Sequence, residues 1–199
     1  MASKKKALAG FANLGFFKVT TNDTTGYAVE GTRSSLIGAR SCSYTDNKNT
    51  DPIPGDDGLY DNANDWTDTD LTITVNEMSL ENLAAITGAD YDDETGELKE
   101  GIYDVAPEIA ITFSALMRDG GYRLYQYYAA KCNGHNVSHT TKGDGNSVQT
   151  YELSFNCAGR AYDGKVRDTK DVEKGSALTW LDSIPSQPTQ PDEDQSEQS

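Results

Sequence analysis

The sequence predicts a mainly β protein, built as a two-sheet antiparallel β-sandwich with one short flanking α-helix, a long loop and extended terminal arms. Three observations lead to this fold class. Several stretches alternate apolar and polar residues, glycine-rich turns separate them, and only one segment has helical apolar spacing. A chain of 199 residues is long enough for one domain with a sizeable core.

Four stretches carry the strand prediction. Residues 71–75 place Leu71, Ile73 and Val75 on one face and threonines on the other, and the same alternation runs through residues 109–117, 122–131 and 148–158. Gly120-Gly121 predicts a turn between two of these strands, and Asp163-Gly164 predicts a two-residue hairpin within residues 162–166.

A short helix is predicted after residue 79. Ser79 is a suitable N-cap, and Gly88 is a suitable stop. The apolar stripe between them consists of Leu80, Leu83, Ala84 and Ile86.

The remaining segments have no periodicity of their own. Residues 44–68 are rich in Pro, Gly and Asp and are predicted to be one long loop, which in a compact domain is usually functional. The predicted domain covers residues 1–182, with residues 1–15 as an N-terminal arm. Residues 183–199 form an acidic tail rich in Pro, Gln and Ser.

The formal net charge of −15 is concentrated in three segments. Residues 44–70 carry −7, residues 90–100 carry −5 and residues 183–199 carry −4, so the rest of the chain is nearly neutral. This balance disfavours a broadly basic nucleic-acid-binding surface. The sequence contains no apolar run of the roughly 20 residues that a membrane-spanning helix needs.

Cys132, His135 and His139 have a spacing that metal ligands can adopt, but the sequence offers no fourth ligand nearby. The segment is more typical of a loop between strands. No nucleophile motif or phosphate-binding loop is present. We therefore expect no cofactor, no metal and no enzymatic activity, with a metal-dependent enzyme as the weakest class.

The order of several short motifs resembles a known family. An Asp-rich segment ending in Leu59-Tyr60-Asp61 precedes an alternating strand and the short helix, and further motifs follow in order: APEIAITF (106–113), RDGGYRLY (118–125), TKGD (141–144) and YDGK (162–165). This order, over roughly residues 14–170, resembles the major tail protein (tail tube protein) family of long-tailed, non-contractile phages of Gram-positive bacteria. Each motif is short, so the order and spacing carry the resemblance.

The resemblance implies a β-sandwich subunit that forms hexameric rings, which stack into a hollow tube. DNA passes through this tube during ejection, as transiting cargo only. The implied partners are further copies of the chain and the tape-measure, tail terminator and distal tail proteins, with no membrane. The implied location is the tail of the virion, after synthesis in the host cytoplasm.

Two sets of residues follow as candidates within this family. The polar faces of two alternating strands would suit a wet lumen that does not hold phosphate. These lumen-lining candidates are Asp70, Thr72, Thr74, Asn76, Thr150, Glu152, Ser154 and Asn156. The same faces could equally point outward, because alternation alone does not show whether a polar face lines the lumen or the outer surface.

The second set lies in the segment 44–68, which we expect to join one ring to the next. Apolar and aromatic side chains in a polar loop are typical interface anchors. These inter-ring candidates are Pro52, Pro54, Leu59, Tyr60 and Trp66.

A second function class also fits the composition. A β-sandwich adhesion or binding module on a virion or cell surface would have the same strand pattern. A signal peptide or sorting motif would favour it, and we identify neither in the sequence.

Overall fold

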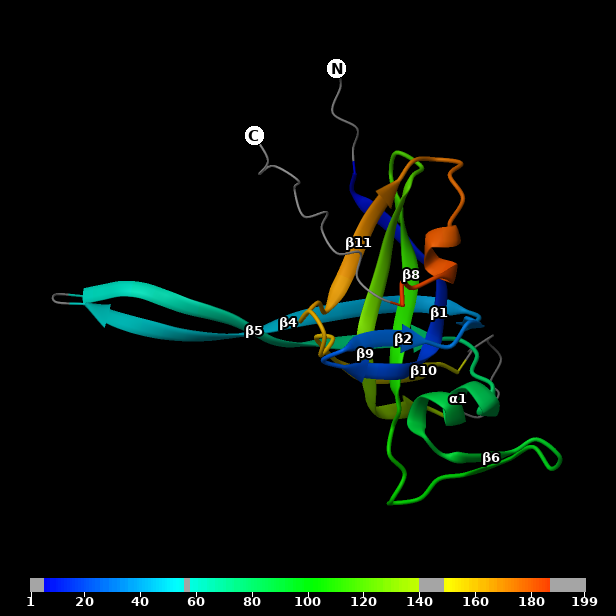
Figure 1. Cartoon of the computed structure of the whole chain (residues 1–199). Helices are drawn as coiled ribbons and strands as arrows, with labels where there is room; N and C mark the ends of the chain where they lie inside the picture. Colours follow the sequence, from blue (N-terminus) through cyan, green and yellow to red (C-terminus); the bar gives the residue numbers. More distant parts are fainter. Residues whose placement is uncertain (1–5, 56–57, 140–148, 187–199) are drawn as a thin grey trace, which may run out of the picture.

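The computed structural model describes residues 6–55, 58–139 and 149–186, except for the side chains of residues 50–64 (Figure 1). The described chain is mainly β, as predicted. The main strands are β1 (Leu8–Asp23), β2 (Gly26–Val29), β4 (Ala39–Gly55), β5 (Gly58–Val75), β8 (Glu108–Met117), β9 (Tyr122–Val137), β10 (Tyr151–Ala158) and β11 (Arg167–Val172). Smaller elements are β3 (Ser34–Ser35), α1 (Leu80–Thr87), β6 (Asp90–Asp92), β7 (Glu97–Lys99) and the 3-10 helix η1 (Thr179–Asp182). No described helix has the length and apolarity needed to cross a membrane.

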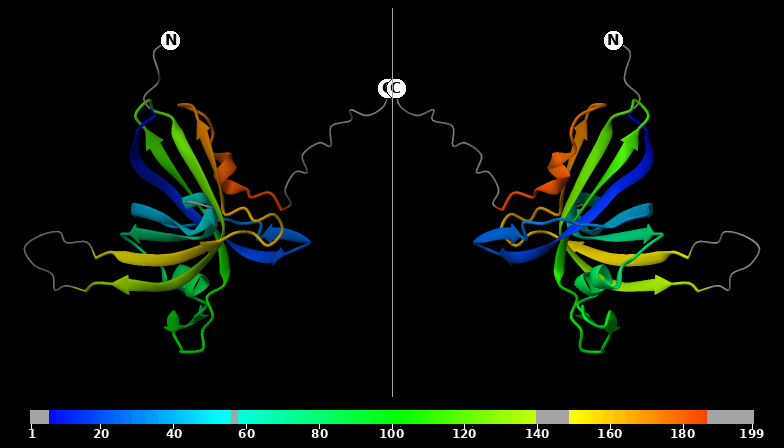
Figure 2. Two further views of the ribbon diagram at one scale, coloured as in Figure 1. Left: turned by 90° about the vertical axis from the view of Figure 1, so that its left-hand side faces the viewer. Right: turned by 90° about the vertical axis from the view of Figure 1, so that its right-hand side faces the viewer.

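One antiparallel sheet in the order β2-β1-β8-β9-β10-β5-β4 bends over to form two layers. The bend is possible because β9 is long: its first half pairs with β11 and its second half pairs with β10. Strands β4, β5 and β10 therefore run across the direction of β8 and β11 (Figures 1 and 2).

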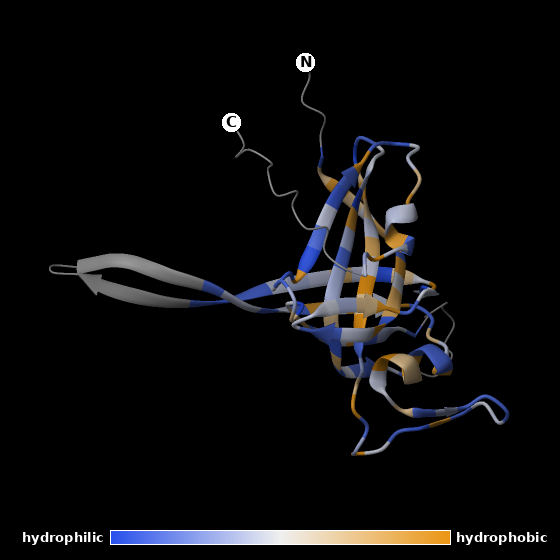
Figure 3. Cartoon of the chain, viewed as in Figure 1, coloured by the Kyte–Doolittle hydropathy of each residue, from blue (hydrophilic) through white to orange (hydrophobic). Residues whose placement is uncertain are grey.

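The main core lies between these layers. On β5 the side chains of Leu71, Ile73 and Val75 are fully buried, and Leu153 and Phe155 of β10 lie beside them in register. Residues of β8, β9 and α1 complete the same apolar cluster, which appears as the orange bands inside the body in Figure 3. The predicted alternation is thus confirmed for residues 71–75 and, within the predicted stretch 148–158, for residues 151–158.

Strand β8 is buried on both faces. Ile109, Ile111 and Phe113 enter the main core, as predicted, while Ala110 enters a second apolar cluster. Phe17, Tyr27, Tyr128 and Ile184 belong to this second cluster. Ile184 is 7% exposed, so the packed body extends two residues beyond the boundary expected at residue 182.

The short helix forms as the sequence predicts. The Ser79 side chain accepts a hydrogen bond from the backbone N–H of Asn82, and Gly88 ends α1 in the left-handed conformation (φ 80°). Leu83, Ala84 and Ile86 are buried, whereas Leu80, the first residue of the expected stripe, is exposed.

The prediction of an N-terminal arm over residues 1–15 is wrong from Leu8 onward, where the chain belongs to the sheet. From Leu8 onward the chain belongs to β1, and its backbone pairs with β8 from Met117 back to Ile109. Glycines and Asn13 interrupt the apolar pattern of this strand, and a bulge between Ala12 and Gly15 shifts its register. These interruptions hide the strand in the sequence.

The prediction of a loop over residues 44–68 is also wrong. These residues lie in β4 and β5, which pair continuously to Gly55 and Gly58 and project from the body as a long hairpin (Figure 1). We call the projecting part, residues 47–66, the arm. Both prolines lie on β4, which ends the sheet order, where a missing N–H interrupts no further pairing.

The turn predicted at Gly120-Gly121 joins β8 to β9, and Gly120 adopts the left-handed conformation there (φ 85°). Residues 162–166, however, form no hairpin between neighbouring strands. They connect β10 to β11, and each of these strands pairs with a different half of β9.

Candidate assembly surfaces: the polar face and the base of the arm

The predicted lumen-lining residues of β5 and β10 form a single surface. In the register of the two strands, Asp70 lies opposite Asn156, Thr72 opposite Ser154 and Thr74 opposite Glu152. All six side chains are exposed or half-exposed, whereas the residues between them are buried. Asn76 and Thr150 flank the paired stretch, one residue beyond the end of β5 and before the start of β10.

Strand β4 extends this surface by one more row, which the sequence reasoning missed. Ser41 pairs with Thr74, Ser43 with Thr72 and Thr45 with Asp70, and all three are exposed. We call these nine residues of β4, β5 and β10 the polar face: Ser41, Ser43, Thr45, Asp70, Thr72, Thr74, Glu152, Ser154 and Asn156. Serines and threonines at every second position of residues 41–45 were the available signal, but Tyr44 and the supposed loop concealed it.

The charge of the polar face is low and negative. It contains two carboxylates, Asp70 and Glu152, and no lysine or arginine. Lys131 of β9 lies next to Asn156 in register, and its ammonium group is 3.2 Å from a carboxylate oxygen of Glu108. A surface of this kind stays hydrated and offers phosphate little attraction.

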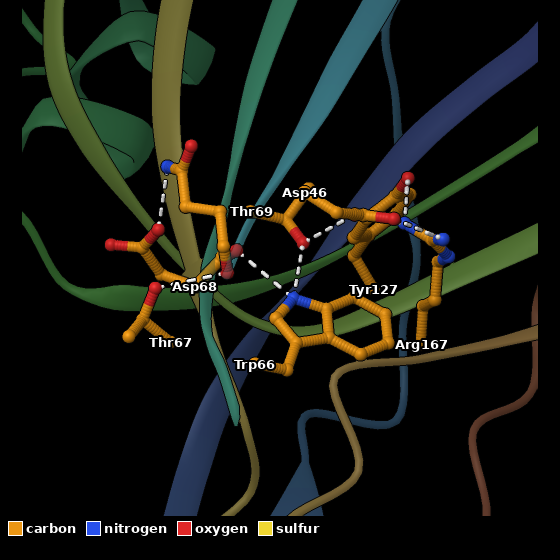
Figure 4. Close-up of polar contacts among 8 residues, drawn as sticks. Asp46, Trp66, Thr67, Asp68, Thr69, Tyr127 and Arg167 are labelled. Carbon is orange, nitrogen blue, oxygen red and sulfur yellow. Dashed lines mark hydrogen bonds and ion pairs between the residues drawn. The ribbon is translucent and has the colours of Figure 1, made fainter. Parts of the chain in front are cut away.

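At the base of the arm, Arg167 of β11 holds Asp46 of β4 through two parallel hydrogen bonds (Figure 4). The nitrogen–oxygen distances are 2.7 and 2.8 Å, and both side chains are largely buried. Thr69 of β5 donates a third hydrogen bond to Asp46 at 2.8 Å. The hydrogen bonds from Arg167 hold the pKa of Asp46 below its usual range, so this carboxylate stays ionised.

Three aromatic rings surround the Arg167 guanidinium. Its central carbon lies 4.6 Å from the ring centre of Tyr44, 5.0 Å from Trp66 and 5.7 Å from Tyr127. The Trp66 indole N–H donates to the backbone carbonyl of Asp68 at 2.9 Å, which fixes the ring (Figure 4). Together, Asp46, Thr69, Arg167 and these three rings make the base clamp, which joins the arm to the body.

Two asparagines reinforce the junction between the arm and the polar face. The amide of Asn47 donates to carboxylate oxygens of both Asp68 and Asp70, at 2.7 and 2.8 Å. Asn156 donates to Asp68 at 2.9 Å from the other side. These hydrogen bonds, first from Asn156 and then from Asn47, lower the pKa of Asp68.

Of the five inter-ring candidates, only Trp66 has a described side chain. It is 43% exposed and part of the base clamp, so one of its faces contacts Arg167 while the rest meets solvent. Pro52, Pro54, Leu59 and Tyr60 lie in the paired strands of the arm, but their side chains fall outside the described residues.

The structure does not bring Cys132, His135 and His139 together. His135 lies 3.8 Å from Glu100 and shares a shallow pocket with Cys132, whereas the ring of His139 contacts Gln149 at 2.9 Å. Within residues 6–55, 58–139 and 149–186, no three Cys, His, Asp or Glu side chains are grouped so that they could hold a metal ion. Burial raises the pKa of the Cys132 thiol.

No protein-family model matches this chain, and neither does any curated protein. Solved structures do match. The tube-terminating cap of the anti-feeding prophage has 9% identity over 86% of this chain and 100% of that chain, with a TM-score of 0.46. The sheath–tube complex of the extracellular contractile injection system PVC has 10% identity over 80% and 89%, with a TM-score of 0.42. The Hcp protein has 8% identity over 81% and 100%, with a TM-score of 0.36. At these identities and scores, the likenesses carry no argument about function.

Proposed function

We propose that this chain is a structural, self-assembling subunit of a phage-type tail tube. Six copies would form a ring, and rings would stack into a hollow tube through which DNA passes. The chain's role is then structural and not catalytic. The observation that carries the proposal is the polar face, polar side chains on three paired strands backed by the buried residues of β5 and β10.

A channel for DNA must stay wet and must not retain phosphate. The polar face meets both conditions, because its side chains are polar, able to form hydrogen bonds with water and free of positive charge. Asp70 and Glu152 would be repeated around a ring, so a few carboxylates per copy would suffice to repel the DNA backbone.

The unpaired ends of the sheet support assembly into rings. Strands β2 and β4 stand at the two ends of the sheet order, and each pairs with one neighbour. Exposed strand edges tend to recruit further strands, so natural proteins cover or close them. A closed ring of copies would place one copy's edge against the next and remove both edges.

The arm supports contact between rings. An isolated two-stranded ribbon is at best marginally stable in water, so a projecting hairpin needs a surface to pack against. The base clamp fixes the direction in which the arm leaves the body (Figure 4). We propose that its outer part, with Pro52, Pro54, Leu59 and Tyr60, packs on a neighbouring ring.

The finer assignments follow from the resemblance in the sequence. We propose that the tube belongs to a long-tailed, non-contractile phage of a Gram-positive host, in the tail of its virion. The partners would be the tape-measure, tail terminator and distal tail proteins, with DNA as transiting cargo.

Negative-stain electron microscopy of the purified chain tests the proposal. Stacked rings or rods with a stain-filled channel are expected. Monodisperse monomers at high concentration would contradict the proposal and favour an adhesion module. A chain lacking residues 50–62 keeps the base clamp and should give rings or monomers without rods; normal rods would exclude the arm as a ring-to-ring contact.

A further inference from the structure

Asn22, Glu108 and Lys131 form a chain of polar contacts across three neighbouring strands. Asn22 belongs to β1, Glu108 is the first residue of β8, and Lys131 of β9 lies opposite Glu108 in register. One carboxylate oxygen of Glu108 accepts a hydrogen bond from the side-chain amide of Asn22 at 2.8 Å. The other oxygen lies 3.2 Å from the side-chain nitrogen of Lys131. A single carboxylate therefore holds an amine and a carboxamide next to each other.

The carboxamide of Asn22 is also held at its oxygen, which accepts a hydrogen bond from the backbone N–H of Ala161 at 2.9 Å. Ala161 follows Arg160, which is 3% exposed. The guanidinium of Arg160 donates two hydrogen bonds to Asp163, at 3.0 and 2.6 Å. The N–H of Ala161 thus belongs to a well-fixed turn, and the orientation of the Asn22 amide is set from both sides.

These four groups have the properties that amide exchange between a lysine and an asparagine requires. The reaction needs an amine nucleophile, a carbonyl polarised by a hydrogen-bond donor, and a group that moves a proton from the attacking to the leaving nitrogen. Lys131 is the amine, and the N–H of Ala161 is the donor to the carbonyl. Glu108 contacts both nitrogens, so it can carry the proton between them.

We propose that Lys131 and Asn22 become joined by an isopeptide bond, with Glu108 as the proton carrier. The Lys131 nitrogen forms a bond to Cγ of Asn22, and the bond from Cγ to Nδ2 breaks. Glu108 takes one proton from the attacking nitrogen and gives it to the leaving nitrogen, which departs as ammonia. The carbonyl oxygen stays on Cγ, so the step needs no oxidant, reductant or further reactant.

The exposure of the three side chains permits this movement. The Lys131 side chain is 56% exposed, so its flexible stem can carry the nitrogen from Glu108 to the Asn22 carbonyl. The Glu108 side chain is 29% exposed and Asn22 is half-buried, so the carboxylate and the carbonyl stay in place. A lysine attacks only as the neutral amine, so the bond should form slowly near neutral pH and faster in mild alkali.

The bond has two consequences for the chain. It ties β1 to β9 across β8, which lies between them in the sheet. It also removes the positive charge of Lys131, which lies beside Asn156 of the polar face in register. The polar face then borders on one cation fewer. The inference concerns a single chain, so its failure would leave the proposed tube untouched.

Mass spectrometry of the purified, full-length chain tests the proposal. After incubation in mild alkali, a growing fraction of the chain should be lighter by one ammonia. Trypsin should then release a branched peptide that joins residues 19–33, which contain Asn22, to residues 124–142, in which cleavage after Lys131 is blocked. Absence of this branched peptide after prolonged incubation would overturn the proposal.

Three variants test the role of each group. Lys131→Arg keeps a cation beside Glu108 but has no amine to form the bond, so it should give no branched peptide. Glu108→Gln removes the proton carrier and should slow bond formation about 100-fold or more; an unchanged rate would contradict the role of Glu108. The matched control is Lys99→Arg, which replaces a lysine that lies 3.7 Å from Glu97 and should react like the original chain.

The branched peptide separates this bond from another loss of ammonia. Asn133-Gly134 is exposed, and an Asn-Gly pair can lose ammonia by closing onto its own backbone, which gives the same intact mass. That product would still form in Lys131→Arg. A mass loss that persists in Lys131→Arg, without a branched peptide in the original chain, would assign the ammonia to such ring closure and overturn the proposal.

Discussion

Asp46 and Arg167 are 121 residues apart in the chain, yet their side chains meet in a two-point ion pair at the base of the arm. Asp46 belongs to β4 and Arg167 to β11, strands that do not pair with each other. The ion pair therefore ties the arm to the opposite layer of the body. Rotation of the arm at its base would separate Arg167 from Asp46 and from the rings of Tyr44 and Trp66.

Replacing Arg167 should loosen the arm. Arg167→Ala removes both charge-assisted hydrogen bonds and should lower the free energy of unfolding by about 2 kcal/mol. Arg167→Lys keeps the charge but not the two-point geometry, so an intermediate loss is expected. Urea unfolding measures the loss, and hydrogen exchange should become faster in residues 44–48 and 66–70. Unchanged exchange there would show that the ion pair does not hold the arm.

The carboxylates of Asp46 and Asp68 should make the folded chain less stable in acid. The pKa values of Asp46 and Asp68 are lower in the folded chain than the ordinary value of 3.8. Their contribution to the free energy of unfolding is therefore present above about pH 4 and is lost as the pH falls toward their pKa values in the folded chain. The midpoint temperature of thermal unfolding should be nearly constant from about pH 7 to 5 and should fall below about pH 4. Asp46→Asn should show a smaller drop over that range; an equal drop would remove Asp46 from this account.

The described start of the C-terminal segment is part of the fold. Ile184 is buried against Phe17 and Tyr128, and the Ser183 carbonyl accepts a hydrogen bond from the Gln126 side chain at 2.9 Å. Truncation after Leu181 should therefore cost about 2 kcal/mol of stability. Truncation after Ser186 should cost nothing and leave assembly intact. Equal stability of the two truncated chains, by urea unfolding, would contradict this role for Ile184.

An introduced cysteine can report where the polar face points. Burial raises the pKa of the native Cys42 and Cys157 thiols to about 12, which makes them poor nucleophiles near neutral pH. Ser154→Cys should react with a bulky maleimide polymer in monomers and be protected in assembled tubes. Tyr162→Cys serves as the control outside the polar face and should react in both states. Equal labelling of Ser154→Cys in both states would place the polar face on the outside.

The sequence predicts those elements whose residues alternate against a core. Residues 71–75 and the helix after Ser79 each bury one apolar face, and every second residue of 109–117 enters the main core, so periodicity identifies all three. The arm, residues 47–66, has no such alternation in its sequence. Backbone pairing across β4 and β5 defines it instead.

The candidate site also has one part with a local sequence pattern and one part formed by long-range contacts. The polar face of β5 and β10 is predictable, since it is the reverse of an apolar alternation. The base clamp is not, because Arg167 comes from a short strand without alternation and meets Asp46 only through the bend of the sheet. The long-range bend of β9, which decides which strands share a layer, leaves no local pattern.

Cryo-electron microscopy of the purified, full-length chain at high concentration tests the central claim most directly. The account predicts hollow rods of stacked six-fold rings, with Thr72 and Ser154 facing the channel and the arm lying on a neighbouring ring. Particles that remain single copies, or rods whose channel is lined by another face of the sheet, would contradict it.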